Sequence, residues 1–285
     1  MSIAFDRSGP AGAPVLLLHG IGGGRLIWRG PVAALAAAGF DAIAVDLPGY
    51  GDSLAVSAGG VGLMADAVLA LMDSLSLQTA AIVGHSMGGM VAQTLAAQAP
   101  QRVSALVLAC TSPAFGKPDG GWQARFVAER LAPLDAGLGM PGLAAQLVPP
   151  MVGPTADANG VALAQQVMGA VPEATYRRVL AAIVAFDGRA ALPQLTMPTL
   201  CLAGALDRTA PPEVMRRMAE RLPHARYAQI EGAGHIANVE QPDAFHTELI
   251  RFLQEKPMND PQAHVRSLPP EGALASLGAA RREAP

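Results

Sequence analysis

Short, continuous apolar runs alternate with longer segments of helical spacing along the first 110 residues of the chain. Runs of this kind, bounded by turn residues, are typical of strands that are buried on both faces of a parallel sheet. The pattern predicts strands at 14–18, 41–45, 80–83 and 103–109. It predicts helices between and after them, at about 28–38, 62–75 and 90–98. Strands and helices that alternate with right-handed crossovers form a parallel sheet covered on both faces.

The pattern changes at about residue 112, where prolines and glycines recur and apolar residues take helical spacing up to about residue 187. We interpret this stretch as a helical insertion. The alternation then resumes with strands at 199–203 and 225–230 and helices at 212–222 and 242–253. We expect four parts: a first core segment (1–111), a helical cap (112–190), a second core segment (191–256) and a flexible tail (257–285). The tail is rich in Pro, Ala and Gly without a sustained apolar face.

Composition narrows the classes of protein that fit. The 285 residues carry a formal net charge of −3, and charged residues make up 15%, which offers no basic face for nucleic acid. Mean hydropathy is high, at +0.30, but glycine, proline or charge interrupts each apolar stretch, so no membrane-spanning helix is expected. Met1–Arg7 lacks the pattern of a secretory signal. We expect a cytoplasmic protein in which Cys110 and Cys201 are buried thiols rather than a disulfide or a metal pair.

The first candidate for chemistry is the stretch Gly84-His85-Ser86-Met87-Gly88. It fits G-x-S-x-G, in which a serine occupies a tight turn between a strand and a helix and small residues on either side permit the turn. A glycine-rich turn with an incidental serine is the alternative interpretation. The apolar run before Ser86 and the helical spacing after it favour the strand-turn-helix context. A serine hydroxyl is hardly ionised at neutral pH, so Ser86 needs a neighbouring base.

Six histidines are available as that base. His224, His246 and His264 are expected to be solvated. His85 adjoins Ser86, but the turn should direct it elsewhere, to pack beside the site. His19 lies in a glycine-rich loop (19–24) after the first predicted strand, where it is expected to shape the loop by hydrogen bonds. His235 follows the last strand in a flexible loop and can reach across the sheet edge.

A carboxylate must orient the histidine, and Asp207 leaves the penultimate strand at the same edge. The rival position, after the strand that ends at Ala109, holds Cys110 and Thr111 and offers no acid. Loops after neighbouring parallel strands converge, so Asp207 and His235 can meet above Ser86. A helix N-cap and a turn histidine are the structural alternatives for these two residues. The chain order Ser86, Asp207, His235 matches the arrangement of α/β-hydrolases.

These motifs, with His19-Gly20 and the loop Asp46-Leu47-Pro48-Gly49-Tyr50-Gly51-Asp52-Ser53, resemble the α/β-hydrolase superfamily over roughly residues 3 to 255. The resemblance implies an α/β-hydrolase fold in which Ser86 is the nucleophile, His235 the general base and Asp207 its orienting acid. It also implies that the amides of Ile21 and Met87 form an oxyanion hole. Asp46 and Asp52 are expected to be structural, tying down their loop.

Within the superfamily, residues 232–242 and 86–90 are similar to 3-oxoadipate enol-lactonases and related small carboxylesterases. Those enzymes place an aromatic and a basic residue near the substrate, where this chain has Trp122 and Arg125. An exposed helix could also carry both without a catalytic reason. Carbon-carbon hydrolases commonly have a tryptophan where this chain has Ile236, and haloalkane dehalogenases use a carboxylate in place of Ser86. The candidate substrate contacts are His19, Gly20, Gly22, His85, Trp122, Arg125 and Ile236.

The sequence therefore predicts a serine hydrolase that needs no cofactor or metal and cleaves a small carboxylic ester or lactone through an acyl-enzyme. Two alternatives stay open: a carbon-carbon hydrolase or acyltransferase with the same residues, and a non-catalytic ligand receptor on a hydrolase fold. We expect a small-molecule ester or lactone as substrate, no nucleic-acid or membrane partner, and a monomer or homodimer.

Overall fold

The computed structural model describes residues 3–9, 12–55, 60–116 and 121–255. The expected tail at 257–285 lies outside them. Within the described residues, seven strands form one sheet in the order β1-β3-β2-β4-β5-β6-β7. The strands are β1 (Phe5–Arg7), β2 (Pro14–Leu18), β3 (Asp41–Val45), β4 (Ala80–His85), β5 (Val103–Ala109), β6 (Thr199–Gly204) and β7 (Ala225–Ile230).

The sheet is parallel except at one edge, where β1 pairs antiparallel with β3. All the parallel strands therefore end at the same edge of the sheet, which we call the carboxyl edge. An ion pair between Arg7 and Asp41 holds the short β1 to β3, with Arg7 Nη2 2.7 Å from Asp41 Oδ2. Asp41 is the first residue of β3, so this pair lies at the end of β3 away from the carboxyl edge. This architecture confirms the predicted α/β fold with a mostly parallel sheet.

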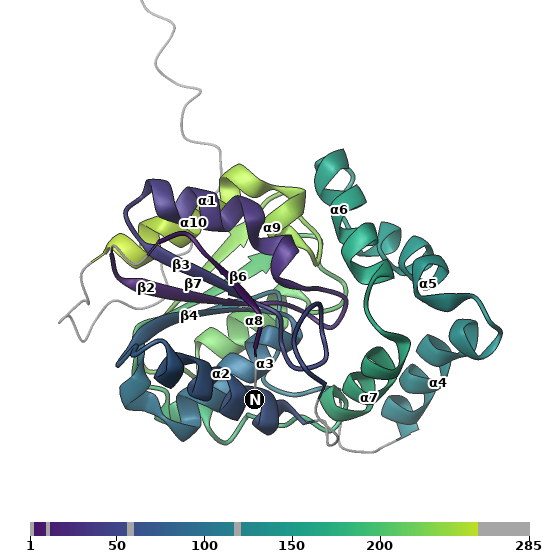
Figure 1. Ribbon diagram of the computed structural model, residues 1–285, viewed down its shortest axis with the longest axis horizontal. Helices are drawn as coiled ribbons and strands as arrows, with labels where there is room; N and C mark the ends of the chain where they lie inside the picture. Colours follow the sequence, from purple (N-terminus) through teal and green to yellow (C-terminus); the bar gives the residue numbers. More distant parts are fainter. Residues whose placement is uncertain (1–2, 10–11, 56–59, 117–120, 256–285) are drawn as a thin grey trace, which may run out of the picture.

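Helices cover both faces of this sheet (Figure 1). One face carries α1 (Arg29–Ala37) and α10 (Pro242–Gln254), and the other carries α2 (Val61–Ser74), α3 (Met87–Gln98) and α8 (Pro212–Ala219). Because both faces are covered, the central strands are apolar throughout, and Val15, Leu16, Ile82 and Val83 have no exposed surface. The loop expected after β7 contains a short helix, α9 (Ala237–Glu240), which the sequence pattern did not indicate.

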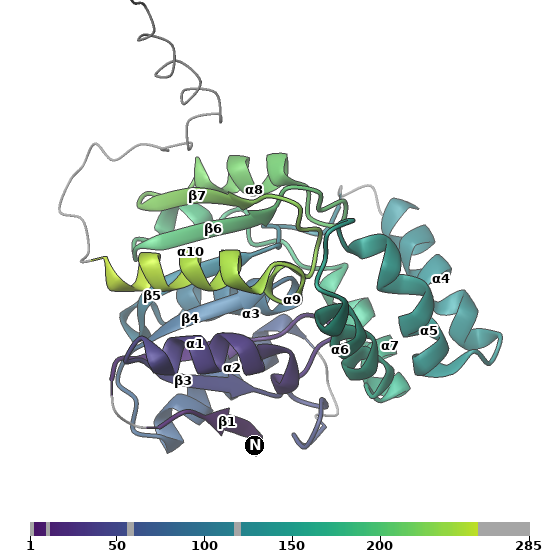
Figure 2. The ribbon, with the colours of Figure 1, turned by 90° about the horizontal axis from the view of Figure 1, so that it is seen from above.

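Four helices of the predicted insertion lie beside the carboxyl edge (Figures 1 and 2). They are α4 (Gly121–Asp135), α5 (Gly139–Leu147), α6 (Ala158–Gly169) and α7 (Glu173–Ile183), and we call them the helical segment. The segment touches the strand-end loops directly. Thr175 Oγ1 of α7 donates a 3.0 Å hydrogen bond to Gly49 O, and a Cβ at Gly22 would come within 3.0 Å of Met168 Sδ of α6. The loops at this edge are thus enclosed between sheet and helices.

Candidate active site

Ser86 occupies a strained turn between β4 and α3. Its backbone has φ 52° and ψ −117°, a conformation that residues with a side chain rarely adopt. The flanking glycines permit the turn, because a Cβ at Gly84 would lie 2.3 Å from Gly88 O and a Cβ at Gly88 would lie 2.1 Å from Leu18 O. The turn is therefore packed so tightly that only glycine fits two residues before the serine and two residues after it.

Hydrogen bonds to the end of β5 hold this turn in place. Ser86 N donates to Ala109 O at 2.9 Å, and Thr111 Oγ1 donates to Ser86 O at 2.7 Å. Cys110, between these partners, also has a positive φ of 46°. Such strained residues persist only where surrounding contacts over-determine them, and they are concentrated at functional sites.

The structure brings Ser86, His235 and Asp207 together at the carboxyl edge. His235 Nε2 lies 3.0 Å from Ser86 Oγ, and His235 Nδ1 lies 2.8 Å from Asp207 Oδ2. Asp207 and His235 are only 3% exposed, whereas Ser86 is only partly buried. The imidazole thus bridges a buried carboxylate and the hydroxyl of a partly buried serine.

The loop after β6 fixes the Asp207 carboxylate. Its other oxygen, Oδ1, accepts hydrogen bonds from Thr209 N at 2.7 Å and Ala210 N at 2.9 Å. With one oxygen engaged by backbone amides, Oδ2 faces the histidine. Both oxygens of this buried carboxylate are therefore satisfied, as burial of a charged group requires.

The His235 loop is held by a group that the sequence interpretation missed. Glu240 is 1% exposed, and its carboxylate accepts from the amides of Gly234 (2.6 Å) and Ile236 (2.7 Å), one on each side of His235. Within the motif at 232–242, the signal was a glutamate that follows His235 by five residues, after a mostly apolar stretch. Ile236 itself is buried beside the histidine.

His85 packs against the same loop. Its Nε2 donates to His235 O at 2.7 Å, and the two rings lie 5.3 Å apart. Burial, with a smaller contribution from the neighbouring His235, lowers the pKa of His85 to about 4. His85 is therefore neutral at pH 7 and supports the His235 backbone.

The glycine-rich loop after β2 is shaped by His19. Its Nδ1 donates to Gly20 O at 2.8 Å and its Nε2 accepts from Leu47 N at 3.0 Å, so both ring nitrogens are engaged. Burial lowers the pKa of His19 to about 4. Gly20 abuts the turn that carries Ser86, since a Cβ there would lie 3.2 Å from Ser86 Cβ.

Two more groups secure this loop. Tyr50, fully buried, donates its hydroxyl to Ile21 O at 3.0 Å, and burial raises its pKa. Asp46 accepts from the backbone amides of Arg25 at 2.7 Å and Asp52 at 3.2 Å and pairs with the Arg25 guanidinium. The structural role expected for Asp46 is confirmed, and the Asp52 carboxylate also pairs with Arg25 at 2.7 Å.

The amides of Ile21 and Met87 stay available at this edge. Among the described residues, neither amide has a hydrogen-bond acceptor within the protein. Met87 N belongs to the first turn of α3, where the helix dipole places partial positive charge. Ile21 lies within the glycine-rich loop, and Met87 directly follows Ser86.

Trp122 and Arg125 lie in the first turns of α4, and both are exposed. The Trp122 ring stacks on Phe126 at 5.3 Å between centroids and contacts Phe115 at 5.6 Å. The tryptophan therefore belongs to an aromatic cluster, on the surface of the helical segment, that Phe126 and Phe115 complete.

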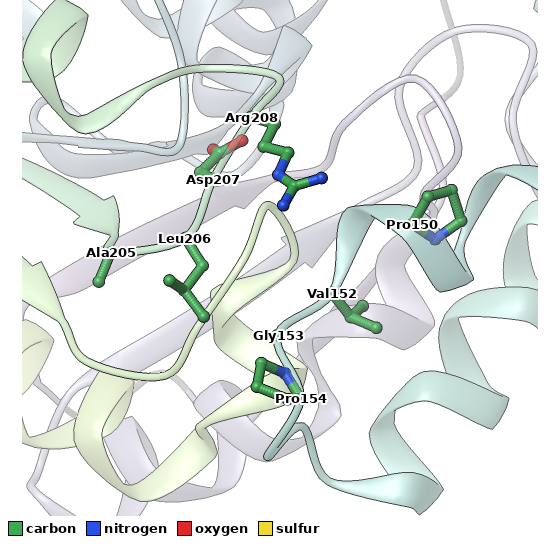
Figure 3. A pocket seen from close by; sticks show the side chains of 8 residues that line it. All are labelled: Pro150, Val152, Gly153, Pro154, Ala205, Leu206, Asp207 and Arg208. Carbon is green, nitrogen blue, oxygen red and sulfur yellow. The ribbon is translucent and has the colours of Figure 1, made fainter.

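A cavity of about 490 Å³ lies behind Asp207, between the linker at 150–154 and the loop at 205–208 (Figure 3). Asp207 borders it through its loop, while its carboxylate faces His235. Ser86 and His235 are not among its lining residues.

Cys110 and Cys201 are buried free thiols, as predicted. His224 is exposed as expected, and His264 lies outside the described residues. The expectation that His246 is solvated was wrong. His246 packs half-buried on α10 near Gly30, because α1 covers that face.

In the described ranges, no group of three or more His, Cys, Asp or Glu side chains could hold a metal. No helix in those same ranges is long and apolar enough to cross a membrane.

A serine on a strained strand-to-helix turn, bridged by histidine to a buried acid at the carboxyl edge of an α/β sheet, has the architecture of an enzyme site. The family model described as "alpha/beta hydrolase fold" matches residues 13–242. The chain belongs to this family, and it is a hydrolase.

Similar proteins span nearly the whole chain. A relative from Variovorax paradoxus (strain S110), which carries the provisional name carbamate hydrolase RutD, is 33% identical over 89% of this chain and 96% of its own. The pimeloyl-[acyl-carrier protein] methyl ester esterase of Vibrio parahaemolyticus is 31% identical over 86% of this chain and 95% of its own. The structure of the enol-lactonase from Burkholderia xenovorans LB400 superposes with a TM-score of 0.79 at 27% identity, covering 89% of this chain and 96% of that one.

Proposed function

We propose that this protein is a serine hydrolase that cleaves a small carboxylic ester or lactone through an acyl-enzyme. The observation that carries the proposal is the position of the His235 imidazole, 3.0 Å from Ser86 Oγ and 2.8 Å from Asp207 Oδ2. Those distances match the reach that a nucleophile, a general base and an orienting acid need. The esterase and enol-lactonase names of similar proteins support the same class of bond.

Protonation follows from the partners of the two ring nitrogens. An ionised Asp207 can only accept, so His235 Nδ1 carries the proton and Nε2 has a free lone pair. As Ser86 Oγ attacks the substrate carbonyl carbon, Nε2 takes the hydroxyl proton and a tetrahedral intermediate forms. The resulting imidazolium is stabilised by the Asp207 carboxylate, which stays ionised.

The negative charge of that intermediate develops on the former carbonyl oxygen. We assign its stabilisation to the amides of Ile21 and Met87, which have no acceptor within the described part of the protein. One such donor contributes about 3 kcal/mol to transition-state stabilisation. Tyr50 supports this role, because its hydroxyl fixes the Ile21 peptide oxygen at 3.0 Å.

The intermediate collapses when the carbon-oxygen bond to the leaving group breaks and the imidazolium gives its proton to the departing oxygen. An ester releases an alcohol, whereas a lactone opens and its new hydroxyl remains on the acyl chain. Water then attacks the acyl-enzyme while His235 takes a proton from it. The second collapse releases the acid and restores the Ser86 hydroxyl.

We assign substrate enclosure to residues 112–190 acting as a cap over the core formed by residues 1–111 and 191–256. Contacts of α6 and α7 with the loops at Gly22 and Gly49 support this division. Gly20, Gly22 and Ile236 line the approach in this proposal, beside His19 and His85. Trp122 and Arg125 on α4 remain proposed substrate contacts.

A fluorophosphonate probe tests the proposal, because it reacts with an activated serine and not with an ordinary one. We expect the wild-type protein to be labelled at Ser86 and to hydrolyse members of a panel of aryl esters and lactones. Ser86→Ala should abolish both, while Ser74→Ala, a serine on α2 whose hydroxyl bonds to Leu71 O, should retain both. Labelling of Ser86→Ala at the wild-type rate would refute the assignment.

A further inference from the structure

Glu240 is a buried carboxylate with three backbone donors, and no side chain among the described residues forms a hydrogen bond or ion pair with it. Its Oε2 accepts from Gly153 N at 2.7 Å and Gly234 N at 2.6 Å, and its Oε1 accepts from Ile236 N at 2.7 Å. Only the bond to Ile236 serves the first turn of α9. The other two reach outside the helix, so helix capping does not account for them.

The three donors come from two segments that meet at His235. Gly234 and Ile236 flank the histidine in sequence, and Gly153 lies in the linker between α5 and α6 of the helical segment. The linker also bonds the histidine itself, because His235 N donates to Met151 O at 2.8 Å. The carboxylate therefore ties the loop that carries His235 to the linker that leads into α6.

From this arrangement we infer that Glu240 is a positioning residue for His235, and that it couples the placement of the imidazole to the helical segment. The inference rests on the proposed function, because it assigns a role only if His235 is the general base. In this role Glu240 contacts neither the substrate nor the reacting atoms, and acts only through His235.

The composition of the loop explains why a clamp is needed. Gly232, with φ 74°, and Gly234 give the backbone before His235 more freedom than other residues would. Base catalysis depends on that backbone, since a displacement of about 1 Å from productive geometry can cost 100-fold in rate. His85 fixes the His235 carbonyl from one side, and Glu240 fixes the amides before and after the histidine.

A pair of variants measures this contribution. Glu240→Gln keeps the size of the side chain but replaces one acceptor oxygen by an amide donor, which faces a backbone donor. Glu240→Ala removes all three hydrogen bonds. The matched control is Asp41→Asn, which alters another buried carboxylate at the opposite end of the sheet, where Asp41 pairs with Arg7.

We expect kcat to fall about 100-fold in Glu240→Ala, and roughly tenfold in Glu240→Gln, with KM little changed in both. The proton NMR signal of His235 Nδ1–H, which the bond to Asp207 shields from exchange, should broaden in both variants. Asp41→Asn should lower stability against urea and leave kcat and this signal as in the wild type. Activities are compared at a temperature where circular dichroism shows each variant folded.

Different failures have different readouts. If Glu240→Gln is folded and keeps the wild-type kcat and proton signal, Glu240 is only a stabilising group and the inference is wrong. If Asp41→Asn loses kcat in proportion to its stability, the effect is general and the inference is also overturned. If instead the wild-type Ser86 does not react with the fluorophosphonate probe, it is the proposed function that fails.

Discussion

The carboxyl edge of the sheet and the outer helices of the helical segment differ in how their functional candidates are held. At the edge, Asp207 and His235 are almost fully buried, and each is fixed by backbone partners as well as by the other. On α4, Trp122 is 42% exposed, and its ring packs on the side chains of Phe115 and Phe126 and against Gly116. The positions of the side chains at the carboxyl edge are fixed by several contacts each, whereas the side chains on α4 have room to move.

That difference separates two kinds of function. Bond-breaking chemistry needs atoms placed within a few tenths of an ångström, which packed strand ends and buried hydrogen bonds provide. Selection of a substrate tolerates side chains that move, which surface helices provide. We therefore expect substitutions at the edge to abolish the reaction and substitutions on α4 to change which substrates react.

The largest effects should come from the three proposed catalytic residues. Ser86→Ala and His235→Ala should each lower kcat by about a millionfold, and Asp207→Asn by about ten-thousandfold, because the groups act as one unit. The Ser86→Ala, His235→Ala double variant should be hardly worse than either single variant. Steady-state kinetics on an activated aryl ester measure all four, and fully additive losses would contradict a shared mechanism.

The turn that carries Ser86 should be the next most sensitive feature. Gly88→Ala places a Cβ 2.1 Å from Leu18 O, which is impossible without movement of β2 or α3, so the strained Ser86 conformation should be lost. We expect loss of fluorophosphonate labelling together with destabilisation of several kcal/mol.

Gly62→Ala is the matched control for that variant. At this helical glycine on α2, no atom of the described residues lies within 4 Å of an added Cβ, so alanine should raise the free energy of unfolding by about 1 kcal/mol and leave labelling intact. A Gly88→Ala protein that labels as fast as Gly62→Ala would show that the turn is not over-determined.

The edge was also the region that the sequence predicted well. Continuous apolar runs specify buried parallel strands, and parallel strands force their terminal loops together, so Ser86, Asp207 and His235 could be brought to one place from pattern alone. Asp207 was predicted as the acid because its loop leaves the penultimate strand, and because the rival position holds only Cys110 and Thr111. The hydrogen bonds that join Ser86, His235 and Asp207 are seen only in the structure.

Other contacts could not be predicted because they join residues distant in sequence. Nothing local connects Glu240 with Gly153, 87 residues away, or His19 Nε2 with the amide of Leu47. The short helix α9 was missed because four residues carry no periodic pattern. The position of α4 depends on aromatic packing among Phe115, Trp122 and Phe126, which helical spacing alone does not specify.

Buried neutral histidines at the edge should make the protein sensitive to acid. The pKa of His19 and of His85 is lowered from 6.5 to about 4, mainly by burial, so the unfolded chain binds more protons than the native protein between these values. Stability is therefore full above about pH 6.5 and falls as the pH drops toward 4, by roughly 3 kcal/mol per histidine.

Urea unfolding at a series of pH values measures this dependence. His85→Asn, which keeps a side-chain donor for His235 O but cannot titrate, should flatten the slope between pH 6.5 and 4. His224→Gln, which changes an exposed histidine, should leave the slope unaltered. An identical slope in His85→Asn and wild type would mean that the edge does not hold this histidine neutral.

The smallest effects should come from α4, where side chains are exposed and few contacts are lost. Trp122→Ala and Arg125→Ala should leave kcat for a simple acetate ester nearly unchanged, because neither residue contacts the proposed catalytic groups. For larger aryl or carboxylate-bearing esters, each should raise KM by about fivefold, the equivalent of roughly 1 kcal/mol from one exposed aromatic or ionic contact. Glu129→Ala, on the same helix and also exposed, is the control and should change neither constant. A fall in kcat toward the small acetate ester would place α4 within the catalytic machinery and remove the division between a rigid edge and an adaptable helix.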